Sequence, residues 1–176
     1  MGCVSSSPDR PFRILVVCTG NICRSPMGQV VLVERLKAAG LDDAVEVASA
    51  GISDEERGNP IDDRAQRVLA EHGYPIPDHA AHQVAPHELA EYDLALAMTQ
   101  QHARALRRRA EIDQDERSAE IRLWREADAE AQSLSGEELD VPDPWYGTQA
   151  GFYDTLAAVE RGADGLLEEL SARLSR

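Results

Sequence analysis

The chain has 176 residues, of which 43% are apolar, so it is long enough for one domain with a substantial core and too short to expect two. Its formal net charge of -14 argues against a nucleic-acid partner, because phosphate backbones require a basic face, and the one basic cluster, Arg107 to Arg109, is typical of a solvated helix end. No apolar run reaches the about 18 residues of a transmembrane helix, and three cysteines without a recognisable signal peptide predict a reducing compartment, hence a cytoplasmic protein.

The first residues, MGCVSS, match the pattern for N-myristoylation at Gly2, with Cys3 placed for a second acyl chain. The alternative is a flexible leader over residues 1–10, followed by a single domain over residues 11–176. The Ala-, Glu- and Arg-rich composition is typical of bacterial proteins, in which lipidation of this kind does not operate. We therefore favour the leader, and expect no membrane association unless this N-terminus is acylated.

The rest of the chain alternates between predicted strands and predicted helices. Continuous β-branched runs indicate strands, while turn residues and capping residues mark where helices begin and end. In chain order the pattern predicts a strand at Phe12–Val17, a helix from Pro26 to Gly40, a strand at Val45–Ser49, a helix at Asp62–His72 ended by Gly73, and a strand at Leu94–Met98.

A helix at Gln100–Arg109 and a fourth strand at Ile121–Trp124 follow, and Glu126–Leu139 is expected to be the least structured segment. Apolar residues then recur every three or four positions and predict a long amphipathic helix, at Phe152, Leu156, Val159, Ala163, Leu166, Leu170 and Leu174. This alternation predicts an α/β fold with a parallel sheet and helices on both faces. Such sheets bind ligands at the carboxyl ends of their strands.

The stretch VVCTGNICRSPMG lies where the first strand turns into the first helix. In the turn from Cys18 to Ser25, backbone N–H groups can point toward one centre and form a cradle for an anion. The same amides and the helix dipole favour a thiolate at Cys18. Arg24 supplies a planar fork that matches two phosphoryl oxygens, and Ser25 can donate its hydroxyl hydrogen to the sulfur. The alternative, a cysteine that only fills the core, is disfavoured by the residues around it.

A second segment, VPDPWYG, places Asp143 between two prolines that stiffen the loop. A phosphoenzyme mechanism needs an acid for the leaving oxygen, and Asp143 is the candidate. Trp145 and Tyr146 can flank an aromatic substrate. An ordinary Asp-Pro turn is the alternative interpretation.

Together these segments resemble the low-molecular-weight protein tyrosine phosphatase family. The similarity extends from VCTGNICRSP through SAG, DDRA and HG to DPWYG, and so covers nearly the whole chain. It implies a four-stranded parallel sheet with the phosphate-binding loop after the first strand, and hydrolysis of phosphotyrosine in proteins through a cysteinyl-phosphate intermediate. It also implies no metal and no other cofactor, with a tyrosine kinase as the functional counterpart.

By this resemblance Cys18 is the nucleophile, Arg24 binds the phosphoryl group, and Asp143 first protonates the leaving phenolate and then activates water. Asn21, Ser25 and His79 match the family's hydrogen-bonded network that shapes the loop, although a structural histidine is the alternative for His79. The substrate-binding residues that it implies are Thr19, Gly20, Asn21, Ile22, Cys23, Ser25, Trp145 and Tyr146.

Two departures from the family pattern concern substrate preference. Family members often place an aromatic residue at the pocket wall, where this chain has Glu55 and Glu56, and many have Met-Asp after the third strand, where it has Met98 and Thr99. Acidic residues at the pocket would repel phosphopeptides with acidic flanks. The alternative is a solvated loop that never meets the substrate.

Single residues argue against other functions that occur on the same fold. Arsenate reductases of this type need further cysteines downstream, and none follows Cys23. Protein-arginine phosphatases tend to carry threonine where this chain has Ile22, whose apolar side chain suits a phenyl ring. A phosphotyrosine-binding module without turnover would not need Asp143. Cys23 is also a candidate to trap oxidised Cys18 as a disulfide, with a small core residue as the alternative.

Overall fold

The computed structural model describes residues 10–113 and 117–175. Gly2 and Cys3 of the acylation hypothesis, and all of the expected leader except Arg10, lie outside the described residues. The helices and strands are β1 (Phe12–Cys18), α1 (Arg24–Ala38), β2 (Val45–Gly51), α2 (Asp63–Glu71), β3 (Leu94–Ala97), α3 (Gln100–Asp113), β4 (Glu120–Leu123) and α4 (Gln149–Leu174).

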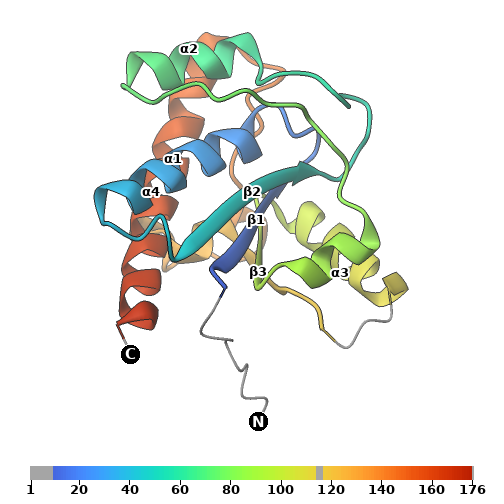
Figure 1. Cartoon of the computed structure of the whole chain (residues 1–176). Coiled ribbons are helices and arrows are strands. Elements are labelled where there is room, and N and C mark those ends of the chain that lie inside the picture. The colour runs from blue at the N-terminus through green and yellow to red at the C-terminus, as the bar shows by residue number, and fades with distance from the viewer. Residues whose placement is uncertain (1–9, 114–116, 176) are drawn as a thin grey trace.

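The four strands form one parallel sheet in the order β2-β1-β3-β4, which confirms the predicted fold class (Figure 1). β1 is central, and its residues from Ile14 to Val17 are completely buried. A strand that is covered on both faces is apolar where it is buried, which is why β1 shows a continuous apolar run from Ile14 to Cys18 rather than an alternation.

Successive side chains of β1 enter two separate cores, because neighbouring residues of a strand point to opposite faces of the sheet. Ile14 and Val16 pack with apolar residues of α1, α2 and α4. Leu15 and Val17 pack on the other face, with residues of α3 and of the segment before β3. Figure 1 shows α1, α2 and α4 on one side of the strands and α3 on the other, so the expectation of helices on both faces is confirmed.

The segment after β4 differs from the sequence prediction. Trp124 is not the last residue of the strand but opens a 3₁₀ helix, Trp124–Ala127, and two more follow at Ala129–Ala131 and Gly136–Leu139. The expectation that Glu126–Leu139 is the least structured segment is therefore wrong. The physical reason is Asp128, a completely buried carboxylate that accepts hydrogen bonds from Arg125 Nε and Arg161 Nε, both at 3.3 Å.

The same segment packs closely against two glycines of α4. The indole of Trp124 lies over Gly162 and donates a hydrogen bond of 3.2 Å to Val159 O. The carbonyl oxygen of Ala127 lies so close to Gly165 that a Cβ atom there would overlap it. Side chains larger than hydrogen at these two positions would push α4 away from the 3₁₀ helix.

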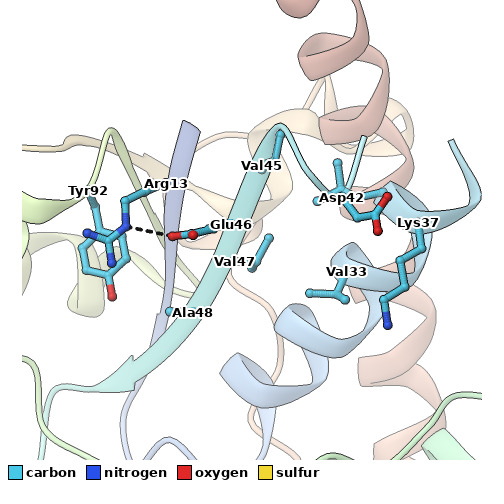
Figure 2. A pocket seen from close by; sticks show the side chains of 10 residues that line it. Arg13, Val33, Lys37, Asp42, Val45, Glu46, Val47, Ala48 and Tyr92 are labelled. Carbon is cyan, nitrogen blue, oxygen red and sulfur yellow. Dashed lines mark hydrogen bonds and ion pairs between the residues drawn. The ribbon is translucent and has the colours of Figure 1, made fainter. Parts of the chain in front are cut away.

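At the amino-terminal end of the strands, a pocket of about 400 Å³ runs along the edge strand β2. Figure 2 shows Arg13 and Tyr92 on one side of this edge and Val33 and Lys37 of α1 on the other, with Arg13 Nε 3.2 Å from Glu46 Oε2. The pocket lies at the opposite end of the strands from Cys18. In residues 10–113 and 117–175, none of the helices combines the length and the apolar composition needed to cross a membrane.

Candidate active site

The loop that follows β1 lies at the carboxyl edge of the parallel sheet. β1 ends at Cys18 and α1 begins at Arg24, so five residues connect the strand to the helix. β1 has β2 on one side and β3 on the other, so the strand order reverses at β1. In open parallel sheets such a reversal creates a ligand-binding crevice at the carboxyl ends of the strands. The geometry places the loop and the N-terminus of α1 at one centre, as the sequence predicts.

Cys18 lies at the bottom of this loop with its side chain almost completely buried. Its Sγ is 3.1 Å from the hydroxyl of Ser25, which is fully buried at the start of α1. The same hydroxyl lies 3.4 Å from Ala50 O, a longer distance. A thiolate at Cys18 would therefore accept the hydrogen bond from the Ser25 hydroxyl in preference to Ala50 O, because a charged acceptor makes the stronger hydrogen bond.

Asn21 holds the loop backbone in an unusual conformation. Its φ is 61°, a left-handed value that asparagine tolerates better than most residues, and its side chain is completely buried. Its Nδ2 donates to Ser25 Oγ at 2.9 Å and to Ser49 Oγ at 3.0 Å, and its Oδ1 accepts from His82 N at 3.2 Å. His79 Nε2 lies 2.6 Å from Asn21 O, so the three residues expected to form a network do lie together.

Two side chains of this network, those of Ser49 and Gln29, were not found from the sequence, and neither was His82, which contributes its backbone N–H. Ser49, on β2, accepts from Asn21 and donates a 2.7 Å hydrogen bond to Gln29 Oε1 of α1. Ser49 belongs to the SAG stretch that carries the family resemblance, and that stretch was the available signal. Gln29 gives no signal in the sequence, because it is one polar residue among several on a helix.

Arg24 points from the first residue of α1 toward the loop and is almost completely buried. Its Nη1 donates to Val141 O at 3.1 Å, and its Nη2 lies 3.4 Å from Asp143 Oδ2 and 3.5 Å from Thr19 Oγ1. Val141 is in turn anchored to the end of β3, since its N–H donates to Met98 O at 2.8 Å.

Asp143 is held beside the arginine by its own turn. Its Oδ1 accepts a 3.0 Å hydrogen bond from Trp145 N, and its side chain is 41% exposed. The alternative of an ordinary Asp-Pro turn is correct as local geometry, but the turn also directs the second carboxylate oxygen to Arg24. Strand β3 and helix α1 thus bring together residues that are more than one hundred positions apart.

A pocket of about 170 Å³ opens over Cys18. Most of the expected site residues line it, whereas Asn21, Ser25 and His79 lie outside its lining. The lining residues are Cys18, Thr19, Gly20, Ile22, Cys23, Arg24, Ser53, Glu55, Glu56, Asp143, Trp145 and Tyr146. Trp145 is 40% exposed and Tyr146 is 91% exposed, so both stand at the mouth of the pocket.

The acidic residues of the loop after β2 also face this mouth. Glu55 N donates to Ser53 Oγ at 3.1 Å, and Glu56 Oε2 accepts from Asn59 Nδ2 at 2.7 Å. The side chain of Glu56 lies against Gly20 of the loop after β1. The carboxylates of Glu55 and Glu56 therefore line this wall of the pocket.

Cys23 is the second thiol of the loop and is also buried. Burial raises the pKa of Cys23 far above its ordinary value, and the nearby carboxylate of Asp62 raises it further. Cys23 is therefore a neutral thiol at physiological pH, which suits a packing role. Its interpretation as the partner of an oxidised Cys18 stays a prediction.

Met98 and Thr99, which depart from the family pattern expected from the sequence, follow β3, and His102 lies in the first turn of α3. Thr99 caps α3, because its Oγ1 accepts from His102 N at 3.2 Å, and in this way performs the capping that an aspartate could also perform. His102 is 3% exposed, and its Nε2 lies 2.8 Å from Thr19 Oγ1. Burial and then the charge of Arg24 lower the pKa of His102 to about 3, so its imidazole is neutral. The sequence prediction did not include His102 in the site.

Comparisons with known proteins agree with this arrangement. The family model for low molecular weight phosphotyrosine protein phosphatase matches residues 13–176. A low molecular weight protein-tyrosine-phosphatase of Streptomyces coelicolor is 44% identical over 156 residues, covering 89% of this chain and 92% of that protein. The crystal structure of a protein tyrosine phosphatase from Entamoeba histolytica has a TM-score of 0.80 at 25% identity, covering 92% of this chain and 97% of that one.

The fold alone is shared more widely. An arginine phosphatase from Drosophila has a TM-score of 0.81 at 22% identity, covering 89% of this chain and 96% of that one. The family match extends over nearly all of the chain and includes the Cys18 loop and the Asp143 loop. The chain belongs to the low molecular weight phosphotyrosine protein phosphatase family.

Proposed function

We propose that Cys18 is the nucleophile with which this phosphatase attacks the phosphorus of protein phosphotyrosine. The chain is a protein-tyrosine phosphatase, a phosphoric monoester hydrolase, and its reaction passes through a cysteinyl phosphate. The observation that carries the assignment is the position of Cys18 Sγ at the bottom of the pocket, 3.1 Å from the Ser25 hydroxyl. That hydroxyl stabilises the thiolate before attack and again when the sulfur leaves.

Arg24 binds the phosphoryl group in this proposal. Its guanidinium is always charged and offers two parallel N–H donors to two phosphoryl oxygens. The Val141 carbonyl and the Thr19 hydroxyl hold it in the pocket from opposite ends of the fork. The Arg24 guanidinium is therefore already oriented to stabilise the negative charge that develops on the phosphoryl group during transfer.

Asp143 acts as the general acid and then as the general base. In the first step it gives a proton to the phenolate oxygen as the P–O bond breaks and the S–P bond forms. In the second step it takes a proton from the water that attacks the cysteinyl phosphate, releasing inorganic phosphate and the Cys18 thiolate. Its position at the mouth, beside Trp145, suits contact with the leaving group.

The pocket walls favour an aromatic leaving group. Ile22 contributes an apolar side chain to the lining, and Trp145 and Tyr146 stand where they can flank a phenyl ring. A tyrosine kinase supplies the phosphorylated protein substrates. The protein acts in the cytoplasm, because a cysteine nucleophile needs a compartment that keeps thiols reduced.

Rapid-quench labelling tests the proposal. The protein is mixed with a phosphotyrosine peptide, quenched in acid, digested and mapped by mass spectrometry. We expect phosphate on Cys18, release of inorganic phosphate at steady state, and neither in Cys18→Ser. Phosphate on another residue would overturn the assignment of the nucleophile.

A second substrate separates the alternatives. The same peptide with phosphoarginine in place of phosphotyrosine should be cleaved far more slowly, because the pocket is lined for a planar aromatic ring. Faster cleavage of the phosphoarginine peptide would favour an arginine phosphatase. Tight binding of phosphotyrosine without release of phosphate would favour a binding module.

A further inference from the structure

His102 is a buried polar residue on the side of the catalytic loop away from the Asn21 network. It lies in the first turn of α3, on the opposite face of the sheet from α1. Its Nε2 is 2.8 Å from the hydroxyl of Thr19, the residue that follows the nucleophile. Strands β1 and β3 are neighbours in the sheet, and this pairing brings together residues separated by 83 positions.

The second ring nitrogen defines the tautomer. His102 Nδ1 is buried and has no hydrogen-bond partner among the residues that the structure describes. A buried N–H without an acceptor is less tolerable than a lone pair without a donor. In the neutral ring the proton therefore resides on Nε2, and Nε2–H donates to Thr19 Oγ1.

Thr19 Oγ1 consequently receives two donors. One is the short hydrogen bond from His102, and the other is the longer one from Arg24 Nη2, at 3.5 Å. The imidazole of His102 holds Thr19 Oγ1 in one position, so the guanidinium of Arg24 can donate to this oxygen in only one orientation. The Val141 carbonyl holds the opposite end of the same guanidinium at 3.1 Å.

We propose that His102 is a positioning residue for phosphoryl transfer: its Nε2–H fixes the Thr19 hydroxyl, which sets the orientation of the Arg24 guanidinium. The proposal rests on the proposed function, in which Arg24 binds the phosphoryl group. It assigns the two sides of the loop different tasks. The network around Asn21 shapes the loop backbone, and the His102–Thr19 pair aligns the arginine.

A purely structural histidine does not explain the contacts. The N-terminus of α3 is capped by Thr99 through the backbone N–H of His102, so the cap does not need the imidazole. A leucine or methionine would fill a buried site at the base of α3 without leaving Nδ1 unpaired. The polar contact that the ring does make is directed to the loop that carries the nucleophile.

Two amide substitutions test the proposal as a matched pair. In His102→Gln the side-chain amide nitrogen can occupy the place of Nε2, whereas in His102→Asn it reaches only the place of Nδ1. Both variants are neutral and polar, so they differ mainly in whether Thr19 is reached. We expect kcat/KM for aryl phosphates within about threefold of wild type in His102→Gln and lowered about tenfold or more in His102→Asn.

The dissociation constant of orthovanadate provides a second measurement, one that a general loss of protein stability would not change. Orthovanadate binds as a mimic of the phosphoryl group in transfer, so its dissociation constant reports the alignment of Arg24. The constant should rise in His102→Asn in parallel with the loss of kcat/KM and stay close to wild type in His102→Gln. Thermal unfolding of both variants shows that the assays are made on folded protein.

A double substitution tests the route through Thr19. Thr19→Val removes the hydroxyl at nearly constant volume, so adding His102→Asn to it should cost no further activity. Equal losses in the Gln and Asn variants, no loss in either, or full additivity with Thr19→Val would each overturn the positioning role. Absence of phosphatase activity in the wild-type protein would instead contradict the proposed function.

Discussion

Asp143 and Arg24 form an ion pair in which one partner is buried and the other is 41% exposed, with 3.4 Å between Oδ2 and Nη2. Pairs that are open to solvent on one side contribute little to stability, because water screens them and the side chain loses entropy. Removing the carboxylate should therefore leave the fold almost unchanged. An effect on turnover can then be assigned to chemistry.

The first prediction concerns proton transfer at this residue. Asp143→Asn should lower kcat for phenyl phosphate by about 10²- to 10⁴-fold, the usual range for general acid–base catalysis. The loss should be smaller for esters with good leaving groups, such as 4-nitrophenyl phosphate, which need less help from an acid in the first step. Asp140→Asn is the matched control, since Asp140 caps α3 by accepting from Gln100 N and an asparagine can still do so. Equal kcat values for wild type and Asp143→Asn on phenyl phosphate would remove Asp143 from the mechanism.

The second prediction concerns acid stability at His102. In the unfolded chain this histidine titrates near 6.5, and in the folded protein burial lowers its pKa to about 3. Below the unfolded value, protons bind the unfolded state first, so the stabilising contribution present above pH 6.5 is lost as the pH falls toward 3. At about pH 5 the loss should reach about 2 kcal/mol.

Urea unfolding of wild type and His102→Gln, each at about pH 7.5 and about pH 5, measures this contribution. Glutamine does not titrate, so the free energy of unfolding of the variant should fall less on acidification. Other groups lose stability equally in both proteins and cancel in the comparison. The same fall in both proteins would mean that His102 becomes charged inside the folded protein without penalty.

Single residues of the site were predictable to the extent that their chemistry is local in sequence. Cys18 ends β1, and Arg24 and Ser25 begin α1, so all three lie within eight residues of sequence and their spacing alone indicates an anion cradle. His102 contacts the same turn from 83 positions away, and only the pairing of β1 with β3 places it there. A lone histidine in a helical pattern carries no information about that pairing.

At the scale of elements, strands and helices with a clear periodicity were predicted well, and the connection after β4 was not. Glu126–Leu139 has a polar composition that favours loops, but its 3₁₀ helices are organised by the buried carboxylate of Asp128. One of the two arginines that satisfy Asp128 is Arg161 of α4, 33 positions away. The secondary-structure propensities of neighbouring residues give no information about a contact between residues 33 positions apart.

The third prediction concerns the packing of α4 on this connection. Gly165→Ala places a methyl group onto the carbonyl of Ala127 and should lower the free energy of unfolding by about 1–3 kcal/mol, the usual cost of overpacking. Gly151→Ala in the same helix is the matched control, because its nearest neighbours are 3.9 Å from the new Cβ. There the gain in helix propensity should raise stability by up to about 1 kcal/mol. A Gly165→Ala variant as stable as wild type would show that α4 moves away at no cost.

At the scale of the whole molecule, charge is the dominant property. The chain carries a formal net charge of -14, and Glu55 and Glu56 add their carboxylates to the pocket wall. A dianionic phosphate must approach through this negative potential before it reaches Arg24. Electrostatic effects of this kind act more strongly on the rate of association than on the affinity, and salt weakens them.

The fourth prediction follows from this potential. Of two phosphotyrosine peptides with lysine or glutamate flanks, the lysine peptide should have the higher kcat/KM, and the preference should shrink as salt rises. It should be largely lost in a Glu55→Gln, Glu56→Gln double variant. Asp43→Asn with Glu168→Gln removes the same net charge at exposed positions outside the pocket lining, and should keep most of the preference. A ratio that ignores both salt and the Glu55 and Glu56 substitutions would show that this wall does not select substrates.

The left-handed backbone of Asn21 also determines when activity can appear during folding. Besides the local hydrogen bond to Ser25, three long-range contacts hold this conformation, and they come from Ser49, His79 and His82, which are 28, 58 and 61 positions away. β1 and α1 can pair and collapse before those contacts exist, because helices and local contacts form earlier than long-range ones. During refolding, far-ultraviolet circular dichroism should therefore recover before orthovanadate binding does. We therefore expect a partly folded chain to have its secondary structure before it can hold a phosphoryl group in the loop after β1.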